Sequence, residues 1–290
     1  MGRTLWPIVV GCVCVLSACS SAPTLILDPA TNTVHDERGF NVVETEHAFV
    51  ISDPKVDEED ARRVGDLFEI GYRVVREDLG EAQRRPRLYM YGSEQQMYDD
   101  LVGRWGYSEW VRKVHTIPRM HPDYIEWVPP REYHDVAFIT HEYSHRIIEQ
   151  IAGLYSQINF KWFDEGLAQY EGQRALVRTS PIAAELKRTE RDHIVGGAFA
   201  AHSLIALRDL TTEGQWGRQI EAGGQLAYAQ AWAVVDYLVG RYGIDHVQEV
   251  LGLVGKGKAF GRAFEKVYGL TVEQAESAFR FSLALAAEGV

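Results

Sequence analysis

Thr140-His141-Glu142-Tyr143-Ser144-His145 is the stretch that decides the fold expected for this chain. On a helix, residues four positions apart lie on the same face, so His141 and His145 can offer two imidazole nitrogens to one Zn²⁺. Glu142 stands beside the pair, where a general base for a zinc-bound water is needed. The pattern therefore predicts a catalytic zinc centre.

Catalytic zinc takes three protein ligands, and Glu165 is the candidate for the third. It follows His145 after nineteen residues, within Trp162-Phe163-Asp164-Glu165-Gly166-Leu167-Ala168-Gln169-Tyr170. Nineteen residues are enough to bring a second helix back antiparallel to the first. In the alternative interpretation, the two histidines are polar residues on a solvated helix face. The flanking residues favour a buried helix and a metal site instead: Val136, Phe138, Ile139, Ile147 and Ile148.

The two runs together resemble the gluzincin metallopeptidases, most closely the small peptidase-MA-like proteins of bacteria. The resemblance implies an α+β fold of the thermolysin-like type, with a small N-terminal sheet and a mostly helical C-terminal lobe. It also implies His141, His145 and Glu165 as zinc ligands and Glu142 as catalytic base. The Gly-x-Met-Glu-Asn motif by which M1 aminopeptidases hold a substrate N-terminus is absent from the sequence, which favours an endopeptidase.

Tyr228 is the candidate donor to the oxyanion that forms during peptide hydrolysis. M1-like gluzincins use a Tyr about sixty residues beyond the third ligand, and Tyr228 lies 63 residues beyond Glu165. In the alternative interpretation, Tyr228 is a core aromatic near the start of a helix. Tyr237, on the same predicted helix, would point in another direction. Two loop histidines, His193 and His202, are interpreted as surface residues rather than ligands.

Residues 1–18 are expected to be a lipoprotein signal peptide. An apolar run from Leu5 to Leu16 leads into Leu16-Ser17-Ala18-Cys19, which resembles the bacterial lipobox. Cys19 would carry lipid, and residues 19–43 would tether the lipid to the folded part. The alternative is an ordinary secretory signal in which Cys19 occurs by chance. Ser20 stands where an inner-membrane retention signal would have Asp. The resemblance to Gram-negative lipoproteins therefore implies the outer membrane, facing the periplasm.

The composition is that of a soluble globular protein with a net charge of −11. An acidic chain lacks the basic surface that nucleic-acid binding requires, so no nucleic-acid partner is expected. The 290 residues suit one large domain or two lobes. We expect an α+β lobe at 44–152, with the His-Glu-x-x-His helix, and a mostly helical lobe at 153–290, with the third ligand.

Periodicity and capping residues predict the elements around the site. Strands are expected near Thr24 to Leu27, and at Glu44 to Ser52, Arg87 to Tyr91 and Tyr124 to Val128. Helices are expected at Asp57 to Leu79, Ser93 to Arg104, Arg131 to Ala152, Ala183 to Arg191, Gln225 to Tyr242, Ile244 to Val254, Lys258 to Tyr268 and Val272 to Ala287. The strand before the zinc helix can pair with a substrate peptide or serve only as structure.

Two hypotheses from different classes follow. The first is a lipid-anchored zinc metallopeptidase that acts on a peptide or protein substrate, with Glu142 as base. The second is a non-catalytic lipoprotein that keeps the peptidase-like fold and acts in binding or envelope assembly. All the positions that the chemistry requires are filled, which favours the first.

Overall fold

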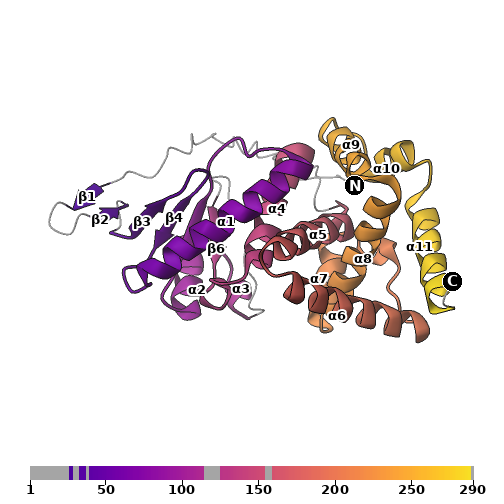
Figure 1. Cartoon of the computed structure of the whole chain (residues 1–290), viewed down its shortest axis with the longest axis horizontal. Helices are drawn as coiled ribbons and strands as arrows, with labels where there is room; N and C mark the ends of the chain where they lie inside the picture. Colours follow the sequence, from indigo (N-terminus) through magenta and orange to yellow (C-terminus); the bar gives the residue numbers. More distant parts are fainter. Residues whose placement is uncertain (1–25, 29–32, 37–38, 114–124, 154–158, 289–290) are drawn as a thin grey trace, which may run out of the picture.

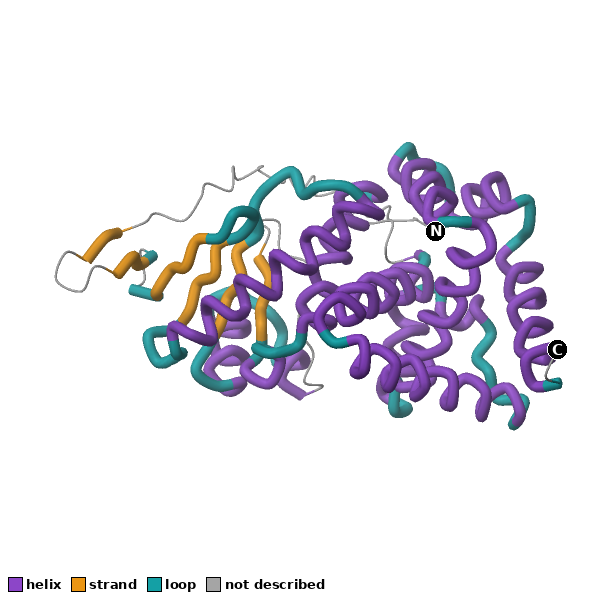
Figure 2. The backbone as a smooth tube through the Cα atoms, in the orientation of Figure 1, coloured by secondary structure: helices purple, strands orange, loops and turns teal. Residues whose placement is uncertain are grey.

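The computed structural model describes residues 26–28, 33–36, 39–113, 125–153 and 159–288. A sheet lies at one end of the molecule and helices form the other end (Figures 1 and 2). The architecture is mostly helical with a small N-terminal sheet, in agreement with the predicted α+β class. Residues 1–25, including the predicted signal peptide and Cys19, lie outside the described residues.

The described part of the sheet has six strands arranged in sequence order. They are β1 (Ile26–Asp28), β2 (Thr33–His35), β3 (Asn41–Glu44), β4 (Phe49–Ser52), β5 (Arg87–Met90) and β6 (Ile125–Val128). The first four pair antiparallel, and β4, β5 and β6 pair parallel. Within the described residues, β6 is therefore an edge strand.

Eleven α-helices and two 3₁₀ turns are present in the described ranges. They are α1 (Glu58–Leu79), α2 (Glu94–Gly103), α3 (Trp110–Lys113), η1 (Pro130–Glu132), α4 (Val136–Ala152), α5 (Lys161–Thr179), α6 (Pro181–Ala200), η3 (Leu207–Leu210), α7 (Glu213–Glu221), α8 (Gln225–Tyr242), α9 (Ile244–Gly255), α10 (Phe260–Tyr268) and α11 (Val272–Ala287). None of these helices is both long and apolar enough to cross a bilayer.

Both faces of the sheet are buried, because successive side chains of a strand point to opposite faces. One face packs against α1 and α4 through Val50, Leu88, Met90 and Val128. The opposite face packs against α2 and α3 through Phe49, Ile51, Tyr89 and Trp127. The first of these clusters continues into α5, α8, α9 and α10, so it connects the sheet to the helices that carry the site.

Two helices, α4 and α5, run antiparallel and form the centre of the molecule, as the nineteen-residue spacing predicts. Two glycines of α5 allow its backbone to approach neighbouring helices closely. A Cβ atom at Gly172 would lie 2.6 Å from the carbonyl oxygen of Ala137 on α4. A Cβ atom at Gly166 would lie 2.3 Å from the carbonyl oxygen of Ala231 on α8. Only glycine permits backbones to meet this closely, so α5 is held on two sides.

The ends of several helices lie close to the predicted bounds, and capping residues mark them. Asp57 caps α1, Ser93 caps α2, and Thr271 forms a capping box with Gln274 at the start of α11. Gly80, Gly243 and Gly269 stand at helix C-termini, each with positive φ. Local hydrogen bonding and backbone freedom decide these ends, which explains why the sequence alone locates them.

Several predicted boundaries are wrong. The single strand expected at Glu44 to Ser52 is two strands, β3 and β4, because Thr45 bonds back to Ala48 and turns the chain. The helix with the His-Glu-x-x-His motif begins at Val136, since Arg131 belongs to η1. The short helix expected at Ala183 to Arg191 extends to Ala200, so His193 is helical and not in a loop.

Candidate metal centre

Three ligand atoms from two helices converge at one point. His141 and His145 lie one turn apart on α4, and their Nε2 atoms are 3.0 Å apart. Oε2 of Glu165, on α5, lies 3.4 Å from the first of these nitrogens and 3.6 Å from the second. All three residues are buried, and Glu165 has no exposed surface. The structure thus brings the predicted ligands together.

This arrangement fits a zinc ion. Zinc bonds of about 2.0–2.1 Å in a tetrahedron place neighbouring ligand atoms about 3.3 Å apart, close to the three observed separations. Two imidazole nitrogens and a carboxylate oxygen are also a donor set that zinc accepts in catalytic sites. Burial lowers the pKa of His141 and so favours the neutral ring, the form that can donate a lone pair to a metal.

Asp164 fixes the orientation of His145. The Nδ1–H group of His145 donates a hydrogen bond of 2.8 Å to Oδ1 of Asp164, which leaves Nε2 to face the ligand cluster. Burial alone would raise the pKa of Asp164, but its interactions with His145 and the nearby charge of Lys161 outweigh that effect and hold the pKa below its usual value. Sequence reasoning did not assign a role to Asp164, because nothing in the motif shows which way it points.

Lys161 holds the other oxygen of the third ligand. Its Nζ lies 3.1 Å from Oε1 of Glu165, 3.3 Å from Oδ2 of Asp164 and 3.4 Å from Oε2 of Glu213. Lys161 is buried, so these ion pairs are poorly screened by solvent. With Oε1 of Glu165 paired to Lys161, Oε2 is the atom that faces the histidines. The sequence pattern did not indicate this role of Lys161 either.

Glu142 lies beside the ligands and is partly exposed. Its Oε1 is 4.0 Å from Nε2 of His141, so its carboxylate reaches the edge of the cluster without replacing Glu165. This is the position predicted for a general base. The structure gives its location; the catalytic role remains a prediction.

Tyr228 also lies at the cluster. Its ring centroid is 6.4 Å from that of His141, and its ring packs edge-on against Trp216 at 5.1 Å. It is half-buried near the start of α8. Tyr237, on the same helix, packs instead against Phe279 at 5.8 Å. The choice of Tyr228 over Tyr237 therefore agrees with their positions, while its role as a donor remains a prediction.

A buried ion pair joins α4 to the edge strand β6. Nε of Arg146 on α4 donates to Oε1 of Glu126 on β6 at 3.0 Å, and Arg146 also pairs with Glu149. Burial, with a smaller contribution from the negative charge of Glu142, raises the pKa of Glu126 to about 7 despite the opposing charge of Arg146. The pair fixes β6 beside the helix that carries both histidines.

Other histidines of the described chain do not join the cluster. His193 and His202 are exposed on and after α6, in agreement with their interpretation as surface residues. A second group with metal-ligand spacing consists of Glu46, His47 and Glu69 at the protein surface. There, Nδ1 of His47 already bonds to Glu69 at 2.7 Å, and its ring stacks on Tyr72.

Comparison with known families agrees with this geometry. A search of curated proteins found no match to the chain. A family model described as the Peptidase MA superfamily matches residues 72–284, which include both histidines, Glu142 and Glu165. The matched region covers well over half of the chain, from the middle of α1 into α11. The chain therefore belongs to the peptidase MA superfamily.

Proposed function

We propose that the protein is a zinc-dependent metallopeptidase that acts as an endopeptidase on peptide or protein substrates. The observation that carries the proposal is the convergence of His141, His145 and Glu165, with their ligand atoms 3.0 to 3.6 Å apart. Family membership supports a peptidase-like activity. Zinc bound at these residues would polarise the substrate carbonyl and lower the pKa of a coordinated water.

The residues of the chain then have separate tasks. Glu142 takes the proton from the attacking water and passes it to the leaving amine. Asp164 keeps Nε2 of His145 aimed at the cluster through its 2.8 Å hydrogen bond. The phenol of Tyr228 donates to the oxyanion that forms on the carbonyl oxygen. These roles use the positions of Glu142 and Tyr228, which both lie close to His141.

The edge strand β6 is the surface on which we propose that the substrate is held. It bonds to β5 on one side, and none of the described strands pairs with its other side. An extended peptide could add to that edge by main-chain hydrogen bonds. The buried pair of Arg146 and Glu126 would keep this strand in register with the helix that carries the histidines.

We also propose that lipid on Cys19 anchors the enzyme at the outer membrane, facing the periplasm. The support is the lipobox-like run before Cys19 and the Ser at position 20. Substrates would then be peptides or proteins of the cell envelope.

Metal analysis followed by peptide cleavage tests the activity. The purified protein should contain one zinc per chain and cleave internally quenched fluorogenic peptides, and a chelator should abolish cleavage until zinc is returned. Peptides blocked at both ends should be cleaved as well as free ones, because an endopeptidase needs no free terminus. One zinc with no turnover of any peptide in a diverse library would instead support the binding or assembly role.

A further inference from the structure

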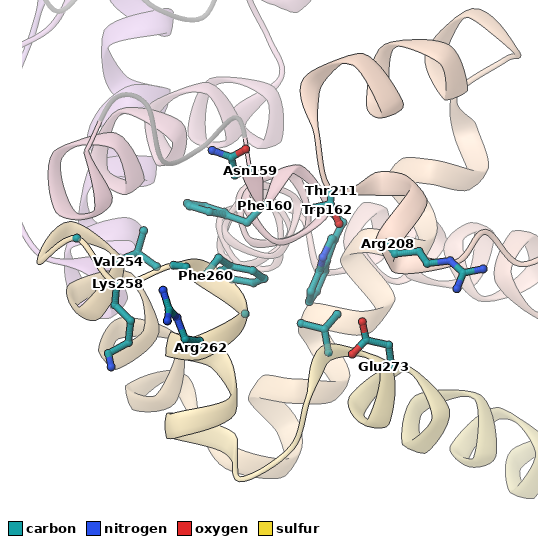
Figure 3. A pocket seen from close by; sticks show the side chains of 14 residues that line it. Asn159, Phe160, Trp162, Arg208, Thr211, Val254, Lys258, Phe260, Arg262 and Glu273 are labelled. Atoms are coloured by element: carbon teal, nitrogen blue, oxygen red, sulfur yellow. The ribbon is translucent and has the colours of Figure 1, made fainter.

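A cavity of about 680 Å³ lies beside the first turn of α5, apart from the metal centre (Figure 3). Its lining comes from the start of α5, the segment that leads into α10, the residues around η3 and the start of α11. Phe160 and Trp162 face this cavity, whereas Lys161 between them reaches Asp164 and Glu165 at the metal centre. The volume is in the range of small-molecule sites.

Unpaired positive charge surrounds the cavity. Arg208, Lys258 and Arg262 all line it, and within the described chain none of them forms a side-chain hydrogen bond or ion pair, although the charge of Arg208 acts on Glu273. Glu273 is the one carboxylate among the lining residues. In a chain with a net charge of −11, three such cations at one cavity produce a local field that favours an anion.

The N-terminus of α10 opens on the same cavity. Residues 257–262 all line it, and the N-cap residue Ala259 has no side chain that could bond to the first amides of the helix. The amide groups of Phe260, Gly261 and Arg262 therefore belong to the unsatisfied first turn. A Cβ atom at Gly261 would meet nothing within 4 Å, so the space in front of this turn is open. Open helix N-termini of this kind bind anions.

Trp162 supplies an independent indication of a ligand. It is fully buried, yet its indole Nε1 has no hydrogen-bond partner in the described structure. In Figure 3 the indole projects from α5 into the space between Phe260 and Arg208. A buried donor without an acceptor is costly, and a bound acceptor would remove that cost. Phe160 and Phe260 stack at 5.1 Å beside it and offer a flat apolar surface.

We propose that this cavity binds a small organic anion that carries a flat apolar group. Its phosphate or carboxylate lies at the first turn of α10, with Lys258 and Arg262 as counter-ions. Its apolar body packs against Phe260, and an acceptor atom receives the indole N–H of Trp162. Nothing in the assignment depends on zinc, so the site can be tested separately from peptidase activity.

Calorimetric titration of the zinc-loaded full-length protein tests the site. The probes are phenyl phosphate, benzoate, inorganic phosphate and neutral benzyl alcohol. Phenyl phosphate or benzoate should bind, and the stronger of the two identifies the anionic group. Inorganic phosphate and benzyl alcohol should bind at least about tenfold more weakly. Phosphate lacks the apolar ring, and benzyl alcohol lacks the negative charge.

Matched variants locate the binding. The double variant Lys258→Gln and Arg262→Gln should weaken binding of the preferred probe by about tenfold or more. Lys266→Gln removes a cation from an exposed position of the same helix, outside the cavity, and should leave binding unchanged. Circular dichroism would confirm that both variants fold.

A second measurement reports binding in the wild-type protein. The indole N–H resonance of Trp162, identified by its loss in Trp162→Phe, should shift on titration with the preferred probe. The proposal is overturned if neither organic anion binds, or if the double variant binds as tightly as wild type. It is also overturned if binding is lost in His141→Ala while Lys258→Gln retains it, because the anion would then occupy the metal centre.

Discussion

Asp164 and His145 form a buried hydrogen bond of 2.8 Å across the two helices that carry the candidate metal ligands. Asp164 is adjacent in sequence to the ligand Glu165, yet it acts on a ligand of the opposite helix. One turn of α5 therefore supplies both a ligand atom and the group that orients another ligand.

Asp164→Asn should weaken zinc binding by about 10- to 100-fold. The uncharged amide accepts the Nδ1–H bond of His145 less strongly than the carboxylate does, so the imidazole ring is oriented less firmly. Competition with a chromophoric chelator measures this affinity. Glu213→Gln is the matched control, because Glu213 also contacts Lys161 but is largely exposed. Equal zinc affinity in Asp164→Asn and wild type would contradict the orienting role.

Glu142→Gln should retain zinc and lose peptidase activity by about 10²- to 10⁴-fold, because it removes the general base but no ligand. His141→Ala and Glu165→Ala should lose both zinc and activity. Metal content and turnover, measured on the same samples, separate the two classes. If Glu142→Gln lost as much zinc as His141→Ala, Glu142 would be a ligand.

Tyr228→Phe should fold and bind zinc normally while kcat falls by roughly ten- to a thousand-fold, the range for one lost oxyanion donor. Tyr237→Phe removes the same hydroxyl from the same helix at a position that packs on Phe279, and should keep wild-type kcat. Steady-state kinetics with one fluorogenic peptide compare the two. Wild-type kcat in Tyr228→Phe would leave that residue a purely structural role.

The ionisation of Glu171 should lower the free energy of unfolding as the pH rises. Burial raises the pKa of this carboxyl well above its usual value, nearby Asp78 raises it further, and Arg174 only partly opposes them. Folded protein then keeps a proton that the unfolded chain releases above a pH of about 4.5, so stability declines from that pH upward. Glu171→Gln imitates the protonated form.

Thermal unfolding at several pH values measures this effect. The Tm of Glu171→Gln relative to wild type should rise with increasing pH, while Glu77→Gln, at an exposed neighbouring carboxylate, should show no such trend. A constant difference across the range would mean that Glu171 has the same pKa in the folded and unfolded states.

Cys19→Ala should release the protein from membranes or leave its precursor unprocessed, because no other residue can accept the lipid that the lipobox-like run implies. Cell fractionation and mass spectrometry of the mature N-terminus measure this. Wild-type protein found in the soluble fraction, with no lipid on Cys19, would contradict the anchor.

The convergence of the three candidate ligands could be predicted because the spacing of the two histidines is local. A spacing of four residues on one helix determines that His141 and His145 share a face, and an acidic residue on the next helix completes the set. The contacts of Asp164 and Lys161 depend on how α5 is rotated against α4. That rotation follows from backbone contacts at Gly166 and Gly172, which no local pattern in the sequence shows.

Elements were predicted best where capping residues mark them, as for α1 and α11. The turn at Thr45 was missed because a side-chain hydrogen bond to Ala48, rather than Gly or Pro, reverses the chain. The cavity beside α10 could not be foreseen either, since its lining comes from segments about a hundred residues apart in sequence.

The close contacts of Gly166 and Gly172 have a consequence for metal exchange. Because backbone contacts with α8 and α4 position α5, the separation of Glu165 from the histidines is set by the fold and not by the ion. We expect the ligand cage to persist when the metal is removed and to accept cobalt or nickel without refolding. Which ion the cell supplies, rather than any adjustment of the protein, would then determine what the site contains.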